Sequence, residues 1–268
     1  MRLVLTNDDG VDSPGIHALA ATCAELGHDV LVLAPSSDLS GASAAVGRIE
    51  PDQRLELRPV ELPGAAAAVE AYALDGPPGL AALVACQGGA GETPDLVLSG
   101  INGGPNTGHS ILHSGTVGGA LTAANFGVSA LAVSLDVADP MPWETASAFV
   151  EQGIELVRGA PPSTVLNLNV PALPLDEVRG LRWATLDRFG TFRVAVAERL
   201  GTSLQMEFRA TGAELDPESD TALLAAGFAT VTAIEGIARI PPERLQEQRR
   251  PPEPEATLVR GADGHEDR

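Results

Sequence analysis

The sequence predicts an α/β protein built on an open, mostly parallel sheet flanked by helices, followed by a β-rich C-terminal extension or arm. Short, nearly continuous apolar runs, the pattern of strands buried on both faces, alternate with longer segments of helical spacing. Strands that alternate with helices in this way favour a parallel sheet. After about residue 180, strand-like segments follow one another directly, which indicates a different arrangement there.

The first unit of this pattern lies at the N-terminus. Residues 2–6 (RLVLT) and 29–35 (DVLVLAP) are predicted strands. Between them, Ser13 and Pro14 suit the N-cap and the first turn of a helix, and Gly27 suits its end. A strand–helix–strand unit of this length predicts two parallel strands joined by a right-handed crossover.

The middle of the chain continues the alternation after a less regular stretch at 36–75. The predicted elements are a half-exposed strand at 54–59, a helix at 79–87, a strand at 94–100, a helix at 117–127, a strand at 130–136, a helix at 143–158 and a strand with one polar face at 164–171. Because residues 117–127 are mostly small, we expect that helix to pack close to the sheet.

Beyond residue 180 we expect paired strands. Segments 180–186 and 194–200 resemble partners, and further strands are predicted at 204–210 and 228–234. Exposed strand edges invite pairing with another chain, so this part is predicted to support a homo-oligomer. The predicted division is an α/β catalytic core at 1–180, a β-rich extension at 181–248 with a short helix at 241–248, and a disordered tail at 249–268.

The composition narrows the class of partner. The chain has 268 residues and a formal net charge of −19. This acidity argues against a nucleic-acid polymer, which needs a basic face, but a bound cation would still allow a small phosphate ester. No signal-peptide plan, membrane-length apolar run or disulfide framework is present, and Cys23 and Cys86 lie in predicted helices. We therefore expect a soluble, cytoplasmic protein that binds no membrane.

Two adjacent carboxylates, Asp8 and Asp9, follow the first predicted strand, and Gly10 lets the chain turn there. Adjacent carboxylates repel, and no Lys or Arg lies nearby in the sequence. A divalent ion would balance them, and oxygen ligands favour Mg²⁺, Mn²⁺ or Ca²⁺ over zinc. The alternative is that the two aspartates cap the following helix.

Neutral oxygen donors follow two other predicted strands, in glycine-containing loops. Ser40 lies in the loop after 29–35, and Asn102 lies in the loop after 94–100. The carboxyl ends of parallel strands meet at one edge of the sheet, so both are expected near Asp8 and Asp9. They either complete an all-oxygen set for a metal or serve as turn residues.

The stretch SGTVGG (114–119) at a predicted helix start is a natural anion site, because free backbone N–H groups and the helix dipole point at it. Phosphate binding by backbone N–H groups would leave metal affinity untouched, since the predicted ligands lie elsewhere. A capped helix that needs close packing is the alternative. His109 and His113 flank the neighbouring glycine loop, and their expected role is on the surface.

Several other catalytic schemes lack their motifs. The chain has no G-x-x-x-x-G-K-[ST], no G-x-G-x-x-G after the first strand and no G-x-S-x-G. Phosphatases with an aspartyl nucleophile carry D-x-D-G at a similar place, but Asn7 stands at the nucleophile position here. An amide cannot form an aspartyl phosphate, so a water activated by a metal remains.

Taken together, five motifs resemble the SurE family of survival-protein 5′/3′-nucleotidases, over about residues 1–240: TNDDG (6–10), AP (34–35) followed by SGAS (40–43), SGINGGPNTG (99–108), SGTV (114–117) and SDTALLAAGFATVT (219–232). The resemblance implies a Rossmann-like core, one divalent metal ion per subunit, and dimers or tetramers that exchange C-terminal segments. It also implies that Asp8, Asp9, Ser40 and Asn102 are metal ligands, and that Asn102, Ser114, Gly115 and Thr116 contact the phosphate of the substrate.

The chain departs from the family pattern at SSDL (36–39), at DGPPGLAA (75–82) and at ALTAANFG (120–127), which bears on substrate preference. The function predicted is a metal-dependent phosphomonoesterase that hydrolyses nucleoside monophosphates, with Asp8 and Asp9 as catalytic residues and Mg²⁺ or Mn²⁺ as cofactor; Ca²⁺ is able to occupy the site. The alternatives are a phosphatase for other phosphate esters or short polyphosphate, and a non-catalytic nucleotide- or metal-binding module.

Overall fold

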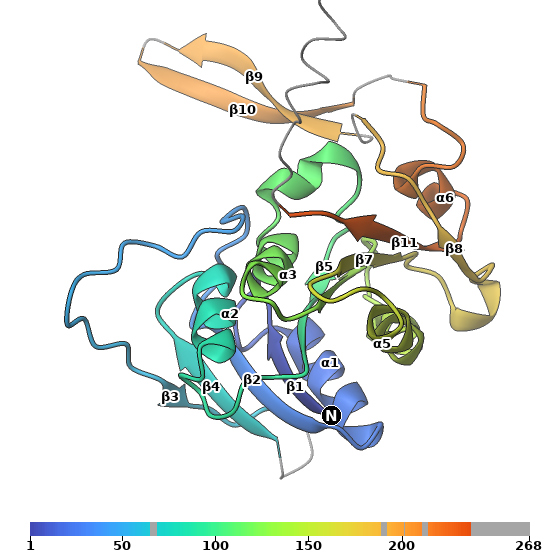
Figure 1. Ribbon diagram of the computed structural model, residues 1–268. Helices are drawn as coiled ribbons and strands as arrows, with labels where there is room; N and C mark the ends of the chain where they lie inside the picture. The colour runs from blue at the N-terminus through green and yellow to red at the C-terminus, as the bar shows by residue number, and fades with distance from the viewer. Residues whose placement is uncertain (65–68, 189–191, 201, 211–213, 237–268) are drawn as a thin grey trace, which may run out of the picture. The chain divides into compact units, whose positions relative to one another are not determined.

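The computed structural model describes residues 1–64, 69–188, 192–200, 202–210 and 214–236, all within one compact unit, Met1–Gly236. Nine strands form the central sheet in the order β3-β4-β2-β1-β5-β6-β7-β11-β8 (Figure 1). They are β1 (Arg2–Thr6), β2 (Asp29–Pro35), β3 (Arg58–Pro59), β4 (Glu70–Leu74), β5 (Leu96–Gly103), β6 (Ala130–Leu135), β7 (Val165–Val170), β8 (Leu181–Trp183) and β11 (Ala229–Ile234).

The six strands from β4 to β7 are mutually parallel, and the outer strands depart from this direction. β3 is antiparallel to β4, and β11 is antiparallel to β7. The predicted open, mostly parallel α/β sheet is confirmed, with the crossover from β1 to β2 running through α1 (Pro14–Glu25). β1 lies between β2 and β5, so the loops after these three strands share one edge.

Helices cover both faces of the sheet (Figure 1). α1 and α5 (Val150–Arg158) contribute to one apolar core, while α2 (Pro78–Cys86) and α3 (Gly115–Asn125) contribute to the other. α3 packs close to the sheet, as its small residues predict. A Cβ atom added at Gly119 would lie 3.2 Å from Ser99 Oγ and 3.3 Å from Thr6 Cγ2.

Local propensity misassigned several elements. The strand expected at 54–59 is reduced to the two residues of β3, and β4 was not predicted. The helix expected at 143–158 is two helices, α4 (Trp143–Ser147) and α5, because the chain turns at Ala148 and Phe149. α6 (Asp220–Ala225), capped by Ser219, was also not predicted as a helix.

The strand pairing expected after residue 180 is wrong. Segment 180–186 contributes β8, which pairs in parallel with β11 at the end of the central sheet. Segment 194–200 lies in β9 (Phe192–Leu200), which pairs with β10 (Ser203–Ala210) as a separate two-stranded hairpin. Part of the predicted extension therefore completes the central sheet. The helix expected at 241–248 and the tail at 249–268 lie outside the described residues.

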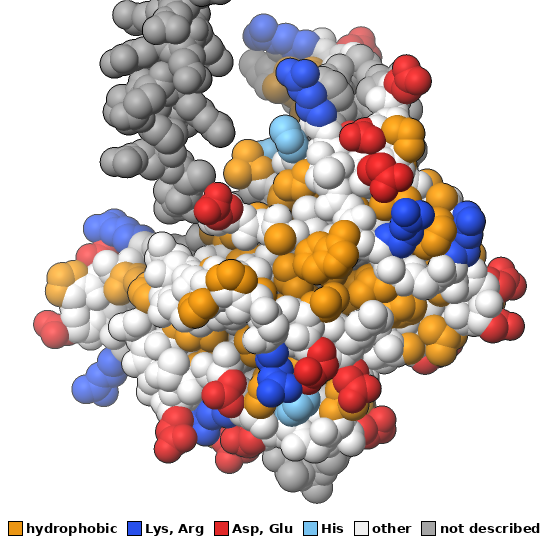
Figure 2. Space-filling model, turned by 45° about the vertical axis from the view of Figure 1, so that its right-hand side comes forward, with side chains coloured by type: hydrophobic (Ala, Val, Ile, Leu, Met, Phe, Trp, Pro, Cys, Tyr) orange, Lys and Arg blue, Asp and Glu red, His pale blue; other side chains and the backbone are white. Residues whose placement is uncertain are grey.

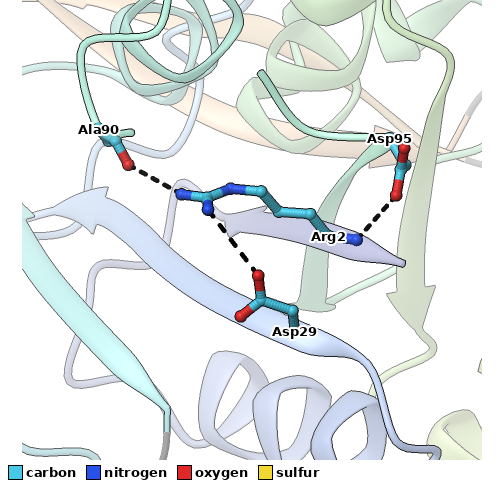
Figure 3. Close-up of polar contacts among 4 residues, drawn as sticks. All are labelled: Arg2, Asp29, Ala90 and Asp95. Carbon is cyan, nitrogen blue, oxygen red and sulfur yellow. Dashed lines mark hydrogen bonds and ion pairs between the residues drawn. The ribbon is translucent and has the colours of Figure 1, made fainter. Parts of the chain in front are cut away.

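The amino ends of the central strands are held by Arg2 (Figure 3). Its backbone N–H donates to Asp95 ahead of β5 at 2.8 Å, and its guanidinium donates to the Ala90 carbonyl at 3.2 Å and lies 3.8 Å from Asp29 of β2. A hollow of about 370 Å³ lies at this same end, lined by Met1, Asp95, Leu96, Ser129, Val157, Arg158, Ala160 and Pro162. None of the predicted site residues lines it.

Candidate active site

The loops after β1, β2 and β5 meet at the carboxyl edge of the sheet, as expected. The Leu39 N–H donates to the Asp8 carbonyl at 2.7 Å, and the Val11 N–H donates to the Pro35 carbonyl at 2.8 Å. Gly10, with a φ of +96°, lets the first loop turn against the second, because an added Cβ would lie 3.0 Å from the Ser37 carbonyl carbon. Ser40 directly follows Leu39, whose N–H bonds to the Asp8 backbone.

Asp8 is buried, 3% exposed, and its carboxylate points at the start of α3. Oδ2 accepts the Gly115 N–H at 3.0 Å, and Oδ1 accepts the Thr116 hydroxyl at 2.5 Å. Burial raises the pKa of Asp8, and the hydrogen bonds from Thr116 and Gly115 oppose that rise. The carboxylate is therefore held in one orientation by groups that lie more than one hundred residues away.

Asp9 has fewer partners. Burial raises its pKa to about 6; the charge of Asp8 adds to this rise, as does that of Asp38, whereas the Gly103 N–H lowers it. This hydrogen bond brings Asp9 against the end of β5, beside Asn102. A raised pKa means that the charged form of the carboxylate is destabilised. A cation bound nearby would stabilise that charged form.

The hypothesis that the aspartates cap the following helix is wrong for α1. The N-cap residue of α1 is Ser13, and no acidic side chain lies in its first turn. Asp8 instead occupies the N-terminus of α3, a helix that begins far along the chain. A carboxylate is favoured there by the exposed N–H groups and the helix dipole.

The two neutral oxygen donors lie in different surroundings. Asn102 donates from Nδ2 to the Gly104 carbonyl at 2.6 Å, which leaves its Oδ1 as the atom for a ligand. Ser40 is exposed, and its hydroxyl donates to Asp38 Oδ1 at 2.6 Å. In this structure the Ser40 hydroxyl is therefore directed at Asp38 and not at Asp8 or Asp9.

Asp38 is a third carboxylate at this edge that sequence reasoning missed. It stands in the SSDL segment, where the chain departs from the family pattern, and its charge contributes to raising the pKa of Asp9. Hydrogen bonds from the Ser40 side chain and backbone lower the pKa of Asp38 itself. Three negative side chains therefore share one end of the sheet, which increases the attraction for a cation.

The oxygen set at this edge fits a divalent cation. Four donors, the N–H groups of Asp8, Gly115 and Thr116 and the Thr116 hydroxyl, hydrogen-bond to the Asp8 carboxylate, which has roughly four lone-pair sites, so an ion would have to share one of them. Among the residues that the structure describes, no three His, Cys, Asp or Glu side chains form a metal-binding group. A site here therefore depends on neutral oxygens as well as on Asp8 and Asp9, which favours hard ions such as Mg²⁺ or Mn²⁺.

The N–H groups in the first turn of α3 donate hydrogen bonds to side chains of the protein itself. Ser114 is its N-cap residue and accepts the Val117 N–H at 3.1 Å, while the N–H groups of Gly115 and Thr116 face Asp8. The close approach needs glycine, because a Cβ at Gly115 would lie 2.6 Å from Asp8 Oδ2. The loop therefore contacts Asp8, one of the predicted ligands, whereas the sequence interpretation placed the predicted ligands elsewhere. Its phosphate contact stays a prediction.

Asn7 and the two histidines are clear of the carboxylates. Asn7 is fully buried, and its Nδ2 donates to the Gly10 carbonyl at 2.9 Å and to Ser13 Oγ at 2.7 Å, which braces the turn after β1. Asn7 therefore has a structural role at the position where phosphatases with an aspartyl nucleophile carry that nucleophile. His109 and His113 are exposed on η1 (Gly108–His113).

The raised pKa of Asp9 predicts that the metal-free protein loses stability as the pH rises. A carboxyl with a folded pKa near 6 stabilises the fold while protonated, and loses that contribution as the pH rises through 6. In excess chelator, Asp9→Asn is expected to melt above the wild type by a few degrees at pH 7.5 and by much less at pH 4.5, nearer to the ordinary carboxyl pKa of 3.8. Thermal melts at both pH values check this; a constant difference between the two proteins would contradict it.

Figure 2 shows carboxylates spread over the visible face, with apolar side chains between them and basic groups scattered rather than gathered. This distribution agrees with the net charge of −19. On that face, no continuous basic surface suited to a nucleic-acid polymer is present.

Comparison with known proteins gives a consistent result. The family model described as survival protein SurE matches residues 3–191. The 5′-nucleotidase SurE of Syntrophobacter fumaroxidans is 34% identical over 242 residues, covering 87% of this chain and 93% of that protein. The 5′/3′-nucleotidase SurE of Erwinia tasmaniensis is 35% identical over 240 residues, covering 87% and 90%.

A solved structure agrees in fold over nearly the whole chain. The crystal structure of the SurE protein from Aquifex aeolicus aligns with a TM-score of 0.75 at 27% sequence identity, covering 93% of this chain and 98% of that one. The resemblance seen in the sequence motifs is confirmed by the family match, the relatives and the fold. This chain belongs to the SurE family.

Proposed function

We propose that this protein is a metal-dependent phosphomonoesterase that hydrolyses nucleoside monophosphates to nucleoside and phosphate. The observation that carries the proposal is the pair of buried Asp8 and half-buried Asp9 at the carboxyl edge, in a chain whose relatives are named 5′-nucleotidases. Asp8, Asp9, Ser40 and Asn102 are the proposed ligands of one Mg²⁺ or Mn²⁺ ion per subunit, and Ca²⁺ is able to occupy the site. When bound, such an ion activates the phosphate and a water for in-line attack.

The two aspartates are proposed to differ in their roles. Asp8 is fixed by Gly115 and Thr116, so it supplies a rigid ligand. Asp9 has the Gly103 N–H as its favourable partner, and is therefore the better candidate to accept a proton from the attacking water as well as to hold the ion. This assignment chooses between two residues that the sequence leaves equivalent.

The phosphate is proposed to lie between the ion and the start of α3, in contact with Asn102, Ser114, Gly115 and Thr116. Ser114 accepts the Val117 N–H and keeps its hydroxyl hydrogen, which can donate to a phosphate oxygen. Gly115 and Thr116 already orient Asp8, so we propose that they act on the phosphate mainly through that ligand. With an ion bound, the site would combine a cation with hydrogen-bond donors, and both stabilise the negative charge of a phosphate.

The substrate class is tested by a panel of esters with phosphate release as the readout. We expect 5′- and 3′-nucleoside monophosphates to be hydrolysed with a kcat/KM at least about tenfold above glucose 6-phosphate and tripolyphosphate, because binding energy from the nucleoside lowers the barrier. Equal rates across the panel would favour a general phosphatase. Nucleotide binding by a protein that releases no phosphate from any member would favour a binding module.

We propose a homo-oligomer, a homodimer or homotetramer, that uses the β9–β10 hairpin. Cross-strand partners Val196 and Met206, and nearby Leu204, are each more than half exposed on this ribbon, which Figure 1 shows apart from the central sheet. Exposed apolar side chains on a two-stranded ribbon suit a contact with another chain.

The double variant Leu204→Glu/Met206→Glu is expected to shift the sedimentation mass toward that of a single chain at micromolar concentration, because it places charges in the proposed contact. Leu175→Glu, which changes a comparably exposed apolar side chain outside the hairpin, is the matched control and should keep the wild-type mass. A wild type that sediments as one chain, or a double variant that keeps the assembled mass, would contradict the proposal.

A cytoplasmic location is proposed because Cys23 and Cys86 are buried free thiols, which suit a reducing compartment. None of the described helices is long and apolar enough to cross a bilayer.

A further inference from the structure

A buried polar network lies beneath the loop that joins β5 to α3, outside the carboxylate site. This loop, residues 104–114, separates Asn102 from the start of α3. Side chains from β7 and α6 bond to its backbone at two points, Asn106 and Gly108, and a β6 side chain bonds to the side chain of Asn106. These contacts connect strands at the far side of the sheet to the loop that carries the proposed ligands.

The first point is Asn106. Its N–H donates to Asn169 Oδ1 at 2.7 Å, and its carbonyl accepts Nδ2 of Asn169 at 2.9 Å and Nδ2 of Asn167 at 2.8 Å. Its own Nδ2 donates to Ser134 Oγ at 2.9 Å. Asn167, Asn169 and Ser134 are at most 1% exposed. Asn169 therefore bonds both backbone polar groups of one loop residue, as a neighbouring strand would.

The second point is Gly108. Its N–H donates at 2.8 Å to Oδ2 of Asp220, a fully buried carboxylate at the start of α6. Oδ1 of Asp220 accepts the N–H groups of Asp187 and Thr221. One side chain therefore bonds to the loop at Gly108, to the segment after β8 and to the first turn of α6. The loop continues through η1 to Ser114.

Each point lies a short distance along the chain from one proposed ligand. Asn106 is two residues from Gly104, whose carbonyl orients the Asn102 amide. Gly108 begins η1, which leads directly to Gly115 and Thr116, the residues that hold Asp8. A shift of the loop would therefore move both ligands.

We propose that Asn169 and Asp220 are positioning residues for the metal site: Asn169 sets Asn102 through Asn106, and Asp220 sets Asp8 through Gly108 and the start of α3. The inference rests on the proposed function. Its specific content is that side chains without contact to the ion or the substrate govern metal affinity, because ligands must be held close to their bound geometry.

Calorimetric titration with Mn²⁺, without substrate, tests the proposal in folded protein. Asn169→Ala removes both bonds to Asn106 and is expected to weaken Mn²⁺ binding about tenfold or more. Asn167→Ala leaves the carbonyl of Asn106 bonded to Asn169 and should cost about threefold or less. Thr230→Val is the matched control: Thr230 is opposite Asn169 on β11, is fully buried, and its hydroxyl has no partner among the described residues. Its titration should equal that of the wild type.

Asp220→Asn, a change of one atom, tests the second point and serves if Asn169→Ala fails to fold. It should weaken Mn²⁺ binding severalfold, whereas Ser219→Ala, which removes only the cap of α6, should not. Thermal melts separate loss of fold from loss of positioning. Wild-type Mn²⁺ affinity in folded Asn169→Ala and Asp220→Asn would overturn the proposal, even where Asp9→Asn abolishes binding. Normal Mn²⁺ binding by folded Asp9→Asn would instead show that the proposed metal site is wrong.

Discussion

Asp9→Asn is expected to lower the rate of nucleoside monophosphate hydrolysis at least about a hundredfold while the protein stays folded. The variant removes a proposed ligand and the proposed base, and several kcal/mol of transition-state stabilisation are lost with them. Folding should survive, because the asparagine relieves a carboxylate whose pKa is raised to about 6 by burial and by the charge of Asp8. Phosphate release at saturating Mn²⁺, together with a melt in chelator, measures both effects.

Asp8→Asn is the informative comparison. It should lose as much activity as Asp9→Asn, but it also weakens the hydrogen bonds from Gly115 and Thr116, so its melting temperature should not rise. If either variant keeps a near-wild-type kcat at saturating Mn²⁺, that aspartate is a structural residue and not a ligand.

Gly115→Val is expected to lower activity by about a hundredfold or more and to weaken Mn²⁺ binding. An added Cβ would lie 2.6 Å from both Cβ and Oδ2 of Asp8, and 2.9 Å from its Cγ, so any larger side chain must push Asp8 out of position. The sequence interpretation expected metal affinity to be spared, whereas the contact with Asp8 leads us to expect a loss. Thr116→Ala, which removes one hydrogen bond to the same carboxylate, should cost about tenfold or less.

Gly115→Ala and Gly159→Ala form the matched pair for this prediction. A Cβ at Gly159 would have its nearest neighbours at 3.6 Å and 3.7 Å, an ordinary contact, so that variant should keep activity and Mn²⁺ affinity. Gly115→Ala should lose both in part. Normal hydrolysis and normal Mn²⁺ binding by Gly115→Val would mean that the start of α3 has no part in holding the ligand.

The fold was predictable where the chain carries strong local patterns. The apolar runs of β1, β2, β5 and β6 and the small residues of α3 predict buried strands and a closely packed helix, because burial on both faces leaves a distinct composition. β4 was missed because its short sequence, EAYAL, contains a glutamate and two alanines. The partner of β8 was mistaken because local pattern does not specify which distant strand completes a ladder.

Part of the candidate site could likewise be predicted from local sequence, and part could not. Adjacent carboxylates without a basic neighbour predict a cation from charge alone, so Asp8 and Asp9 could be identified in the sequence. The bonds that hold Asp8 to Gly115, and Gly108 to Asp220, join residues more than one hundred positions apart. Such contacts have no local signature, so the bonds to Asp220 and the contact of α3 with Asp8 could be found only in the folded chain.

The most direct test of the metal-dependent function is phosphate release from adenosine 5′-monophosphate by extensively dialysed protein, in excess EDTA and after addition of excess Mn²⁺. We predict release at background level in EDTA, recovery with Mn²⁺ in the wild type, and little recovery in Asp9→Asn. Full activity of the dialysed wild type in excess EDTA would contradict the account.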